Sequence, residues 1–235
     1  WGECNLHVVG YSERVHQFMK YEQLAEKLHY LDQFPNAIPY RTTYYKKDWG
    51  FCVTRAQNLA LSESKGELEV CIDSTINDSG SMSIGEIIIP GKKRREYLVS
   101  TYICHPSMAN DNLSGVLATA YLAKLMIEQG KPEYSWRFVF VPETIGAIAY
   151  LNHNEEIMKK LLGGFVISCC GGRGRLGYKE SYVGNHLVDR AVRLAFRDQE
   201  IEPVRYPFAP DGSDERQYSS PGFRVPVTTI TKDKY

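Results

Sequence analysis

The residues with the clearest potential for chemistry lie in one short stretch, residues 104–115. A neutral imidazole and a carboxylate are both zinc ligands, so His105 and Asp111 predict a metal-binding loop. A structural interpretation stays open beside this one. Asn110, Asp111 and Ser114 carry short polar side chains that cap helices, and His105 can equally be a loop histidine hydrogen-bonded within the fold. This stretch alone does not decide between the two.

Other polar groups stand beside other strand-like segments. Glu143 follows the apolar run 136–141 after Pro142, and a carboxylate there can take a proton from a metal-bound water or can simply favour the N-terminus of a helix. Further along, the charged residues of 211–216 precede the last apolar run, 225–230. Since strand ends on one edge of a parallel sheet lie close together, we expect these groups to converge on one pocket.

The segment 211–216 supplies the expected substrate contacts. Asp214 and Glu215 are acidic residues that suit a substrate amine. Arg216 has two interpretations, because its guanidinium can pair with a substrate carboxylate or form a structural ion pair with Asp211 or Glu215. The sequence therefore predicts a substrate-binding role for Asp214, Glu215 and Arg216.

Three cysteines stand near the predicted pocket without adding chemistry to it. Cys169 and Cys170 are interpreted as core residues at a strand end, because adjacent thiols are poorly placed to chelate one ion. A cysteine hydrolase that uses Cys104 beside His105 is disfavoured, since neighbours on a strand point to opposite faces.

The second part of the chain alternates between strand-like and helix-like patterns. This alternation predicts an α/β fold with a mostly parallel sheet and helices on both faces. The expected strands are 96–103, 136–141, 165–169 and 225–230, and the expected helices are 113–129, 145–162 and 185–197.

The first part of the chain has a different character and predicts a small β-rich module. A helical run covers 20–30, and residues 67–73 and 81–90 alternate like two antiparallel strands joined by a turn at 77–80. We therefore expect a β-rich accessory module over 1–90 and an α/β domain over 91–235.

Composition excludes several classes of partner. The chain has 235 residues, with 28 basic residues against 28 acidic ones, so nothing in its charge favours nucleic acid or an anionic membrane. No run is long enough to span a membrane and no signal peptide is visible. Six cysteines without CxxC spacing favour reduced thiols and a cytoplasmic location. A homo-oligomer stays open, and the abrupt start at Trp1 suggests a fragment of a longer protein.

Taken together, these motifs resemble the zinc-dependent aminopeptidase superfamily. The resemblance rests on His105, Ala109-Asn-Asp-Asn-Leu-Ser-Gly115, Pro142-Glu-Thr-Ile-Gly146 and Gly212-Ser-Asp-Glu-Arg-Gln-Tyr218. It is closest to the aminopeptidase-like family of surface-polysaccharide gene clusters, which carries an inserted β-rich domain, and it covers nearly the whole chain. It implies a zinc-exopeptidase-like fold, with His105 and Asp111 as metal ligands and Glu143 as the general base.

The chain departs from that superfamily at several ligand positions. Thr144 stands where a second glutamate is expected, Gly172 where an aspartate ligand is expected, and Glu215 where the superfamily has histidine. The last metal-binding histidine would lie beyond Tyr235, so we expect the peptidase domain to be truncated at its C-terminal end. A catalytic zinc needs three protein ligands, and we therefore expect one zinc ion in preference to two. The candidate third donors are Glu143, Asp214 and Glu215.

Two functions follow as hypotheses. The first is a metal-dependent hydrolase, in which zinc-activated water attacks an amide or peptide bond of a peptide or aminoacyl-type substrate and Glu143 accepts the proton. The alternative is a degenerate, non-catalytic peptidase fold that binds a peptide, an amino sugar or a partner protein. Thr144, Gly172 and the missing histidine favour the alternative.

Overall fold

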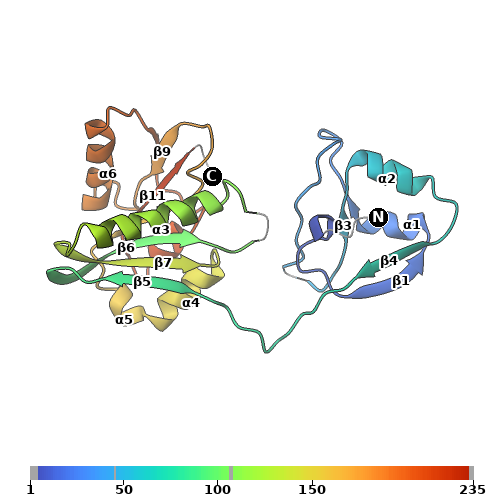
Figure 1. Cartoon of the computed structure of the whole chain (residues 1–235), viewed down its shortest axis with the longest axis horizontal. Helices are drawn as coiled ribbons and strands as arrows, with labels where there is room; N and C mark the ends of the chain where they lie inside the picture. Colours follow the sequence, from blue (N-terminus) through green and yellow to red (C-terminus); the bar gives the residue numbers. More distant parts are fainter. Residues whose placement is uncertain (1–4, 45, 106–107, 233–235) are drawn as a thin grey trace. The chain divides into compact units, whose positions relative to one another are not determined.

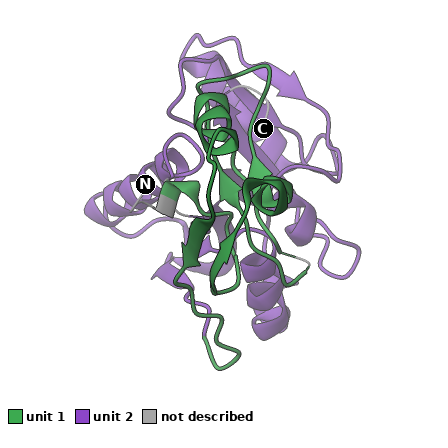
Figure 2. Cartoon of the chain, turned by 90° about the vertical axis from the view of Figure 1, so that its right-hand side faces the viewer, with its two compact units in different colours: residues 1–80 green, residues 81–235 purple. Residues whose placement is uncertain are grey.

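The structure is a computed structural model that describes residues 5–44, 46–105 and 108–232 (Figure 1). The chain divides into two compact units, residues 1–80 and 81–235 (Figure 2). The sequence predicted the boundary at 90/91 instead. The difference arises because β5 (Gly85–Ile89) pairs with β7 (Tyr134–Val141) in the large sheet of the second unit.

The first unit is built from short elements around a small apolar core. Its core residues are Met19, Leu24, Leu28, Val53 and Val70. Its elements are η1 (Asn5–His7), β1 (Val15–Met19), α1 (Tyr21–Leu24), η2 (Ala25–Lys27), β2 (Leu28–His29), β3 (Phe51–Cys52), α2 (Arg55–Ser62) and β4 (Leu68–Ile72). β4 pairs antiparallel with β1, so the predicted hairpin between 67–73 and 81–90 is wrong.

The second unit contains a seven-stranded sheet with the strand order β10-β9-β11-β8-β6-β7-β5. Neighbouring strands are parallel except for the pairs β5/β7 and β9/β11. The remaining strands are β6 (Lys93–Tyr102), β8 (Gly164–Ile167), β9 (Leu176–Lys179), β10 (Val204–Tyr206) and β11 (Val227–Lys232). The predicted α/β class with a mostly parallel sheet is confirmed.

Helices cover both faces of this sheet, because successive strand residues point to opposite sides. Leu98 of β6 packs into the cluster with Ala147 and Met158, whereas Val99 packs into the cluster with Ala123. α3 and α6 accordingly lie on one face, and α4 and α5 lie on the other (Figure 1). The helices are α3 (Leu113–Glu128), α4 (Ile145–His153), α5 (Glu155–Met158), α6 (Leu187–Asp198) and α7 (Glu215–Tyr218).

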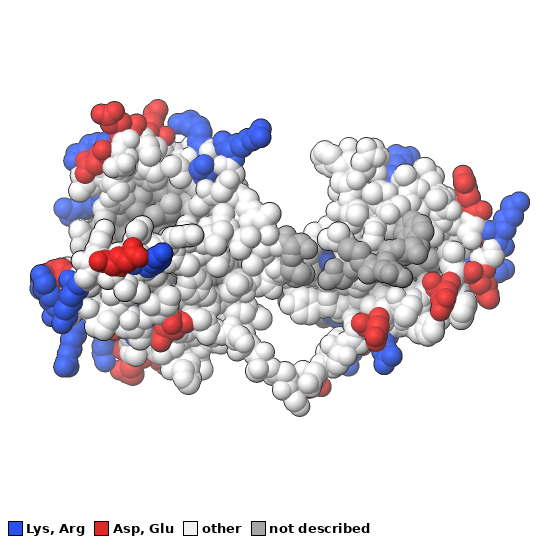
Figure 3. All heavy atoms as spheres, viewed as in Figure 1, with Lys and Arg blue, Asp and Glu red and all other residues white. Residues whose placement is uncertain are grey.

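The surface carries both signs of charge. On the face shown in Figure 3, Lys and Arg side chains lie beside Asp and Glu side chains on each unit, in line with the balanced composition. Among the described residues, no helix has both the length and the apolar character that crossing a bilayer requires.

The parallel strands β6, β7 and β8 end side by side, so the loops that follow them meet at one edge of the sheet.

Candidate functional site

The loop after β6 presents Asp111 at this edge. Asp111 is exposed, and its Oδ1 accepts a hydrogen bond from the hydroxyl of Tyr102, the last residue of β6, at 2.6 Å. His105 is half-buried on the same loop, with Nδ1 3.5 Å from the sulfur of Cys104. Residues 106 and 107 of the predicted metal-binding stretch lie outside the described residues. The carboxylate is therefore held from the side by a buried tyrosine.

Asn112 fastens this loop to the sheet. Its side chain is fully buried, and Nδ2 donates to Thr101 Oγ1 and to the Tyr102 carbonyl, each at 2.9 Å. Its Oδ1 accepts from the backbone N–H of Cys169 at 2.9 Å. One amide thus joins the ends of β6 and β8 and fixes the backbone next to Asp111.

Asn110 and Ser114 connect the same two loops. Ser114 Oγ donates to the Asn110 carbonyl at 2.6 Å and accepts from Cys170 N at 2.9 Å, while Asn110 Oδ1 accepts from Gly171 N at 2.7 Å. The N-cap of α3 is Asn112, whose side chain makes no capping bond. Of the three residues in the capping interpretation, Asn110 and Ser114 bond instead to the loop after β8, and Asp111 accepts from Tyr102.

Close packing at the start of α3 depends on one glycine. A Cβ atom on Gly115 would lie 2.3 Å from Asn112 Oδ1 and 2.5 Å from the Ile167 carbonyl. Both distances are shorter than real Cβ contacts, so any side chain here would push α3 away from β8. Gly115 lets the helix approach closely enough for Asn112 to reach Cys169.

Glu143 and Thr144 follow β7, and Thr144 is tied to the segment before α7. The N–H of Thr144 donates to Asp214 Oδ1 at 2.7 Å. Thr144 has φ 63° and ψ −70°, a conformation that β-branched residues rarely adopt. Asp214 thus reaches across to the loop that carries Glu143 and holds it in a strained conformation.

Asp214 is the most perturbed acid of this edge. The pKa of its carboxyl is raised to about 7: burial and the negative charges of Glu143 and Glu215 raise it, while the Thr144 hydrogen bond and the charge of Arg216 act in the opposite direction. The side chain is fully buried, and Oδ2 has no hydrogen-bond partner among the described residues. A carboxyl with a pKa near 7 can exchange a proton at neutral pH.

Three of the predicted acids also act electrostatically on one thiol. Partial burial raises the pKa of the Cys104 thiol, and the carboxylates of Glu143, Asp111 and Asp214 raise it further, against a hydrogen bond from the Glu143 backbone. Burial likewise raises the pKa of Cys169, with smaller contributions from Asp111 and Glu143. These acids come from three separate segments of the chain. The charges of Asp111, Glu143 and Asp214 therefore all act on the Cys104 thiol.

The other two predicted substrate contacts behave differently from each other. Glu215 is buried and its Oε1 accepts from Lys179 Nζ at 2.8 Å, and the same ammonium pairs with Asp211 at 3.1 Å. Arg216 is half-buried, and its Nε has no hydrogen-bond partner among the described residues. Asp211 and Glu215 thus pair with Lys179, which the sequence did not indicate, in place of Arg216.

The donor set fits zinc in kind and falls short in number. Imidazole and carboxylate are suitable ligands, and His105 and Asp111 share one loop. Over residues 5–44, 46–105 and 108–232, however, no group of three or more His, Cys, Asp or Glu side chains is arranged to hold a metal ion. The described residues therefore provide part of a zinc site.

Comparison with known sequences places these features in a family. A family described as a domain of unknown function (DUF4910) matches residues 17–235. A protein of Clostridium acetobutylicum, described as a candidate polysaccharide biosynthesis protein with an aminopeptidase-like domain, is 42% identical over 233 residues. The match covers 99% of this chain and 53% of that protein.

Solved structures agree on the fold. A crystal structure of a candidate peptidase from Clostridium acetobutylicum superimposes with a TM-score of 0.92 at 41% identity, covering 99% of this chain and 54% of that one. The aminopeptidase from Aneurinibacillus sp. strain AM-1 gives a TM-score of 0.57 at 16% identity, over 87% of this chain and 54% of that one. The fold is aminopeptidase-like, and the chain spans about half the length of the relatives that it matches.

Proposed function

The chain belongs to the DUF4910 family, and from its aminopeptidase-like fold we propose that it is a peptidase-type hydrolase acting on an amide or peptide bond. The observation that carries this proposal is the layout of the sheet edge: Asp111 and Glu143 lie on the loops after the neighbouring strands β6 and β7, and Asp214 Oδ1 accepts from Thr144 N at 2.7 Å. Acids drawn from distant segments to one sheet edge are typical of a reaction centre and rare as a purely structural arrangement. The activity of the whole protein, of which relatives are about twice as long, belongs to the same proposal.

The proposed roles follow from position and charge. Glu143 takes the proton of the attacking water, because it lies on the loop after β7, at the edge of the sheet where β6, β7 and β8 end. Asp214 fixes the loop of Glu143 through the Thr144 N–H and, with Arg216 beside it, faces the substrate. Peptides or aminoacyl compounds are the proposed substrates.

We propose that His105 and Asp111 contribute to one zinc ion. Zinc, when bound, polarises a carbonyl and lowers the pKa of water. Elemental analysis of the purified chain tests this part. Zinc is expected in the wild-type chain and in the control His153→Ala, whose histidine lies at the end of α4, and is expected to be lost in His105→Ala. A wild-type chain without zinc would remove the metal from the proposal.

Hydrolysis is tested with aminoacyl p-nitroanilides. Glu143→Gln keeps the shape of the side chain and removes its basicity, so kcat/KM should fall by roughly 100-fold or more. The control Glu156→Gln changes an exposed glutamate of α5 and should leave the rate unchanged. Retained hydrolysis in Glu143→Gln would exclude Glu143 as the base.

A second function is favoured by one observation, the shortage of metal donors among the described residues. In this case the chain is a non-catalytic peptidase fold that binds a peptide, an amino sugar or a partner protein. Thr144 and Gly172, at positions where ligands are expected, support it. No hydrolysis by the wild-type chain, together with saturable binding of an aminoacyl amide that Asp214→Asn weakens, would establish this function in place of the first.

A further inference from the structure

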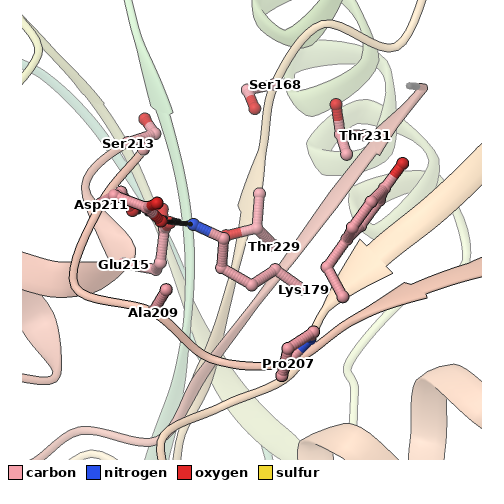
Figure 4. Close-up of a pocket in the computed structure, with 11 residues that line it drawn as sticks. Ser168, Lys179, Pro207, Ala209, Asp211, Ser213, Glu215, Thr229 and Thr231 are labelled. Atoms are coloured by element: carbon pink, nitrogen blue, oxygen red, sulfur yellow. Dashed lines mark hydrogen bonds and ion pairs between the residues drawn. The ribbon is translucent and has the colours of Figure 1, made fainter. Parts of the chain in front are cut away.

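A separate pocket of about 120 Å³ lies beside α7. Its lining comes from β9, β11, the residue after β8 and the stretch from the end of β10 to the start of α7, and most of these residues are labelled in Figure 4. The residues that matter for its chemistry are Ser168, Lys179, Ser213, Glu215 and Thr229. Glu215 links this pocket to the candidate site, because its charge also acts on Asp214.

Buried polar atoms without partners line this pocket. Ser168, Ser213, Glu215 and Thr229 are 0%, 2%, 1% and 4% exposed. Among the described residues, Ser168 Oγ, Ser213 Oγ, Glu215 Oε2 and Thr229 Oγ1 have no hydrogen-bond partner. A buried polar atom without a partner costs stability, so four in one small space indicate that a polar group normally sits among them.

The one ammonium in the lining has no donor to spare. Lys179 Nζ donates to the Asp211 carbonyl at 2.8 Å, to Asp211 Oδ1 at 3.1 Å and to Glu215 Oε1 at 2.8 Å, as Figure 4 shows in part. An ammonium has three N–H donors, and all three are used. An anionic ligand would therefore find hydroxyls alone and would face a carboxylate.

The charges of the lining favour a cation. Lys179 brings one positive charge against two carboxylates, Glu215, which is buried, and Asp211, which is largely exposed, so the lining holds more negative than positive charge. The unused acceptor is Glu215 Oε2, and hydroxyl oxygens on Ser168, Ser213 and Thr229 can accept beside it.

The remaining walls are apolar and suit a short aliphatic stem. Tyr206, Pro207 and Ala209, from the chain between β10 and α7, also line the pocket. We propose that this pocket binds a short alkylammonium group, whose stem packs on Tyr206 and Pro207 and whose ammonium donates to Glu215 Oε2 and the neighbouring hydroxyls. The group would arrive on a peptide side chain, on an amino sugar or as a free amine.

Calorimetric titration with n-butylammonium chloride tests the proposal. We expect saturable binding, with no comparable signal from n-butanol, sodium butyrate or sodium chloride at equal concentration. Equal responses to n-butylammonium and to sodium chloride would show that the pocket holds water alone and would overturn the proposal. An equal or stronger response to butyrate would show that the pocket does not prefer a cation and would also overturn the proposal.

Variants assign the binding to this pocket. Glu215→Gln should weaken n-butylammonium roughly tenfold or more, because a charged hydrogen bond is lost. Because this change also alters the Lys179 pair, Thr229→Val serves as a milder second variant and should weaken binding about threefold. The control Glu180→Gln changes a buried carboxylate that pairs with Arg205 and should leave the affinity for n-butylammonium unchanged. Unchanged affinity in Thr229→Val and in a folded Glu215→Gln would contradict the proposal.

The source of the amine is distinguished by three probes. Nα-acetyl-lysine methylamide presents the amine as a peptide side chain, glucosamine presents it on a sugar ring, and n-butylammonium presents it free. The tightest binder identifies the source. All titrations are repeated in Glu143→Gln, because binding to this pocket does not require hydrolysis. If Glu143→Gln loses hydrolysis but still binds n-butylammonium, the pocket proposal holds independently of the proposed hydrolase function.

Discussion

Two fully buried aspartates of the second unit, Asp189 and Asp214, have opposite surroundings. Asp189 lies in the first turn of α6 and is saturated with donors. Its Oδ1 accepts from Ser181 N at 2.7 Å and from Thr228 Oγ1 at 3.3 Å. Its Oδ2 accepts from Ser181 Oγ at 2.6 Å and from His186 N at 2.8 Å.

Asp214 accepts one hydrogen bond, from Thr144 N at 2.7 Å, and its Oδ2 has no partner among the described residues. Its pKa is raised to about 7 by burial and by the nearby charges of Glu143 and Glu215. The comparison shows that burial alone does not indicate the role of a carboxylate. A saturated carboxylate holds the fold together, whereas a carboxylate left short of donors beside other acids is poised for proton exchange or ligand contact.

The largest expected effect is on the stability of the saturated site. In Asp189→Asn the new amide group points donors at Ser181 or His186, which are themselves donors. Losing these charge-assisted bonds should lower the free energy of unfolding by roughly 3 kcal/mol or more. Urea unfolding followed by circular dichroism measures it. A loss below about 1 kcal/mol would mean that the two aspartates do not differ in the way described.

Asp214→Asn should act through pH. The folded pKa of about 7 lies above the ordinary value of 3.8, so between these values the folded chain holds a proton that the unfolded chain has released. Raising the pH through this window therefore destabilises the wild-type chain, on the order of a few kcal/mol in total, and the variant lacks this loss.

The measurement is the difference in unfolding free energy between Asp214→Asn and wild type. It should grow in favour of the variant from about pH 4 to about pH 7 and stay constant above. Taking the difference cancels the titration of groups that both chains share. If this difference in unfolding free energy does not change between about pH 4 and about pH 7, the pKa of Asp214 is not raised, and the contrast with Asp189 does not hold.

Part of this contrast could be predicted from sequence. The runs that became β6, β7, β8 and β11 are apolar and β-branched because both faces of the sheet are covered, so strand positions were close to correct. Since functional groups follow such strands, the sequence also indicated Asp111, Glu143 and Asp214. The first unit was harder, because pairing of β2 with β3 interrupts the helical spacing predicted over 20–30.

The supporting residues of the site could not be predicted. Tyr102 donates to Asp111 and Asn112 donates to Thr101. Both contacts depend on how the loop backbone turns, which residue spacing in the sequence does not indicate. Lys179 and Glu215 are 36 positions apart in the sequence. Lys179 lies on β9, a strand that the sequence pattern did not indicate, and Glu215 lies on α7. Such contacts depend on which elements become neighbours, and long-range pairing is the information that a single sequence holds least directly.

A smaller effect should come from the strain next to Asp214. Thr144 and Thr54 are both helix N-caps, but Thr144 has φ 63° and no side-chain capping bond, whereas Thr54 accepts from Gln57 N. Thr144→Gly should stabilise the chain by roughly 0.5–1 kcal/mol, because relief of strain exceeds the entropy cost of glycine. Thr54→Gly should destabilise it or leave it unchanged. Destabilisation by Thr144→Gly would show that Thr144 is not strained.

The smallest effect concerns the reactivity of Cys104. The carboxylates of Glu143, Asp111 and Asp214 each raise the pKa of this thiol, so removing one charge should increase its thiolate fraction. At pH 8, Asp111→Asn or Asp214→Asn should speed alkylation of Cys104 by iodoacetamide roughly two- to fivefold.

The alkylation rate is read from the Cys104 peptide by mass spectrometry, with the exposed Cys71 of the first unit as the internal reference. Asp189→Asn is the matched control, because Asp189 is equally buried yet does not contribute to the pKa shift of this thiol. Equal rates in Asp111→Asn, Asp214→Asn and wild type would mean that the acids do not share one electrostatic environment. A rise confined to the variants at the sheet edge would show that Asp214, unlike Asp189, belongs to a cluster whose charges act on each other.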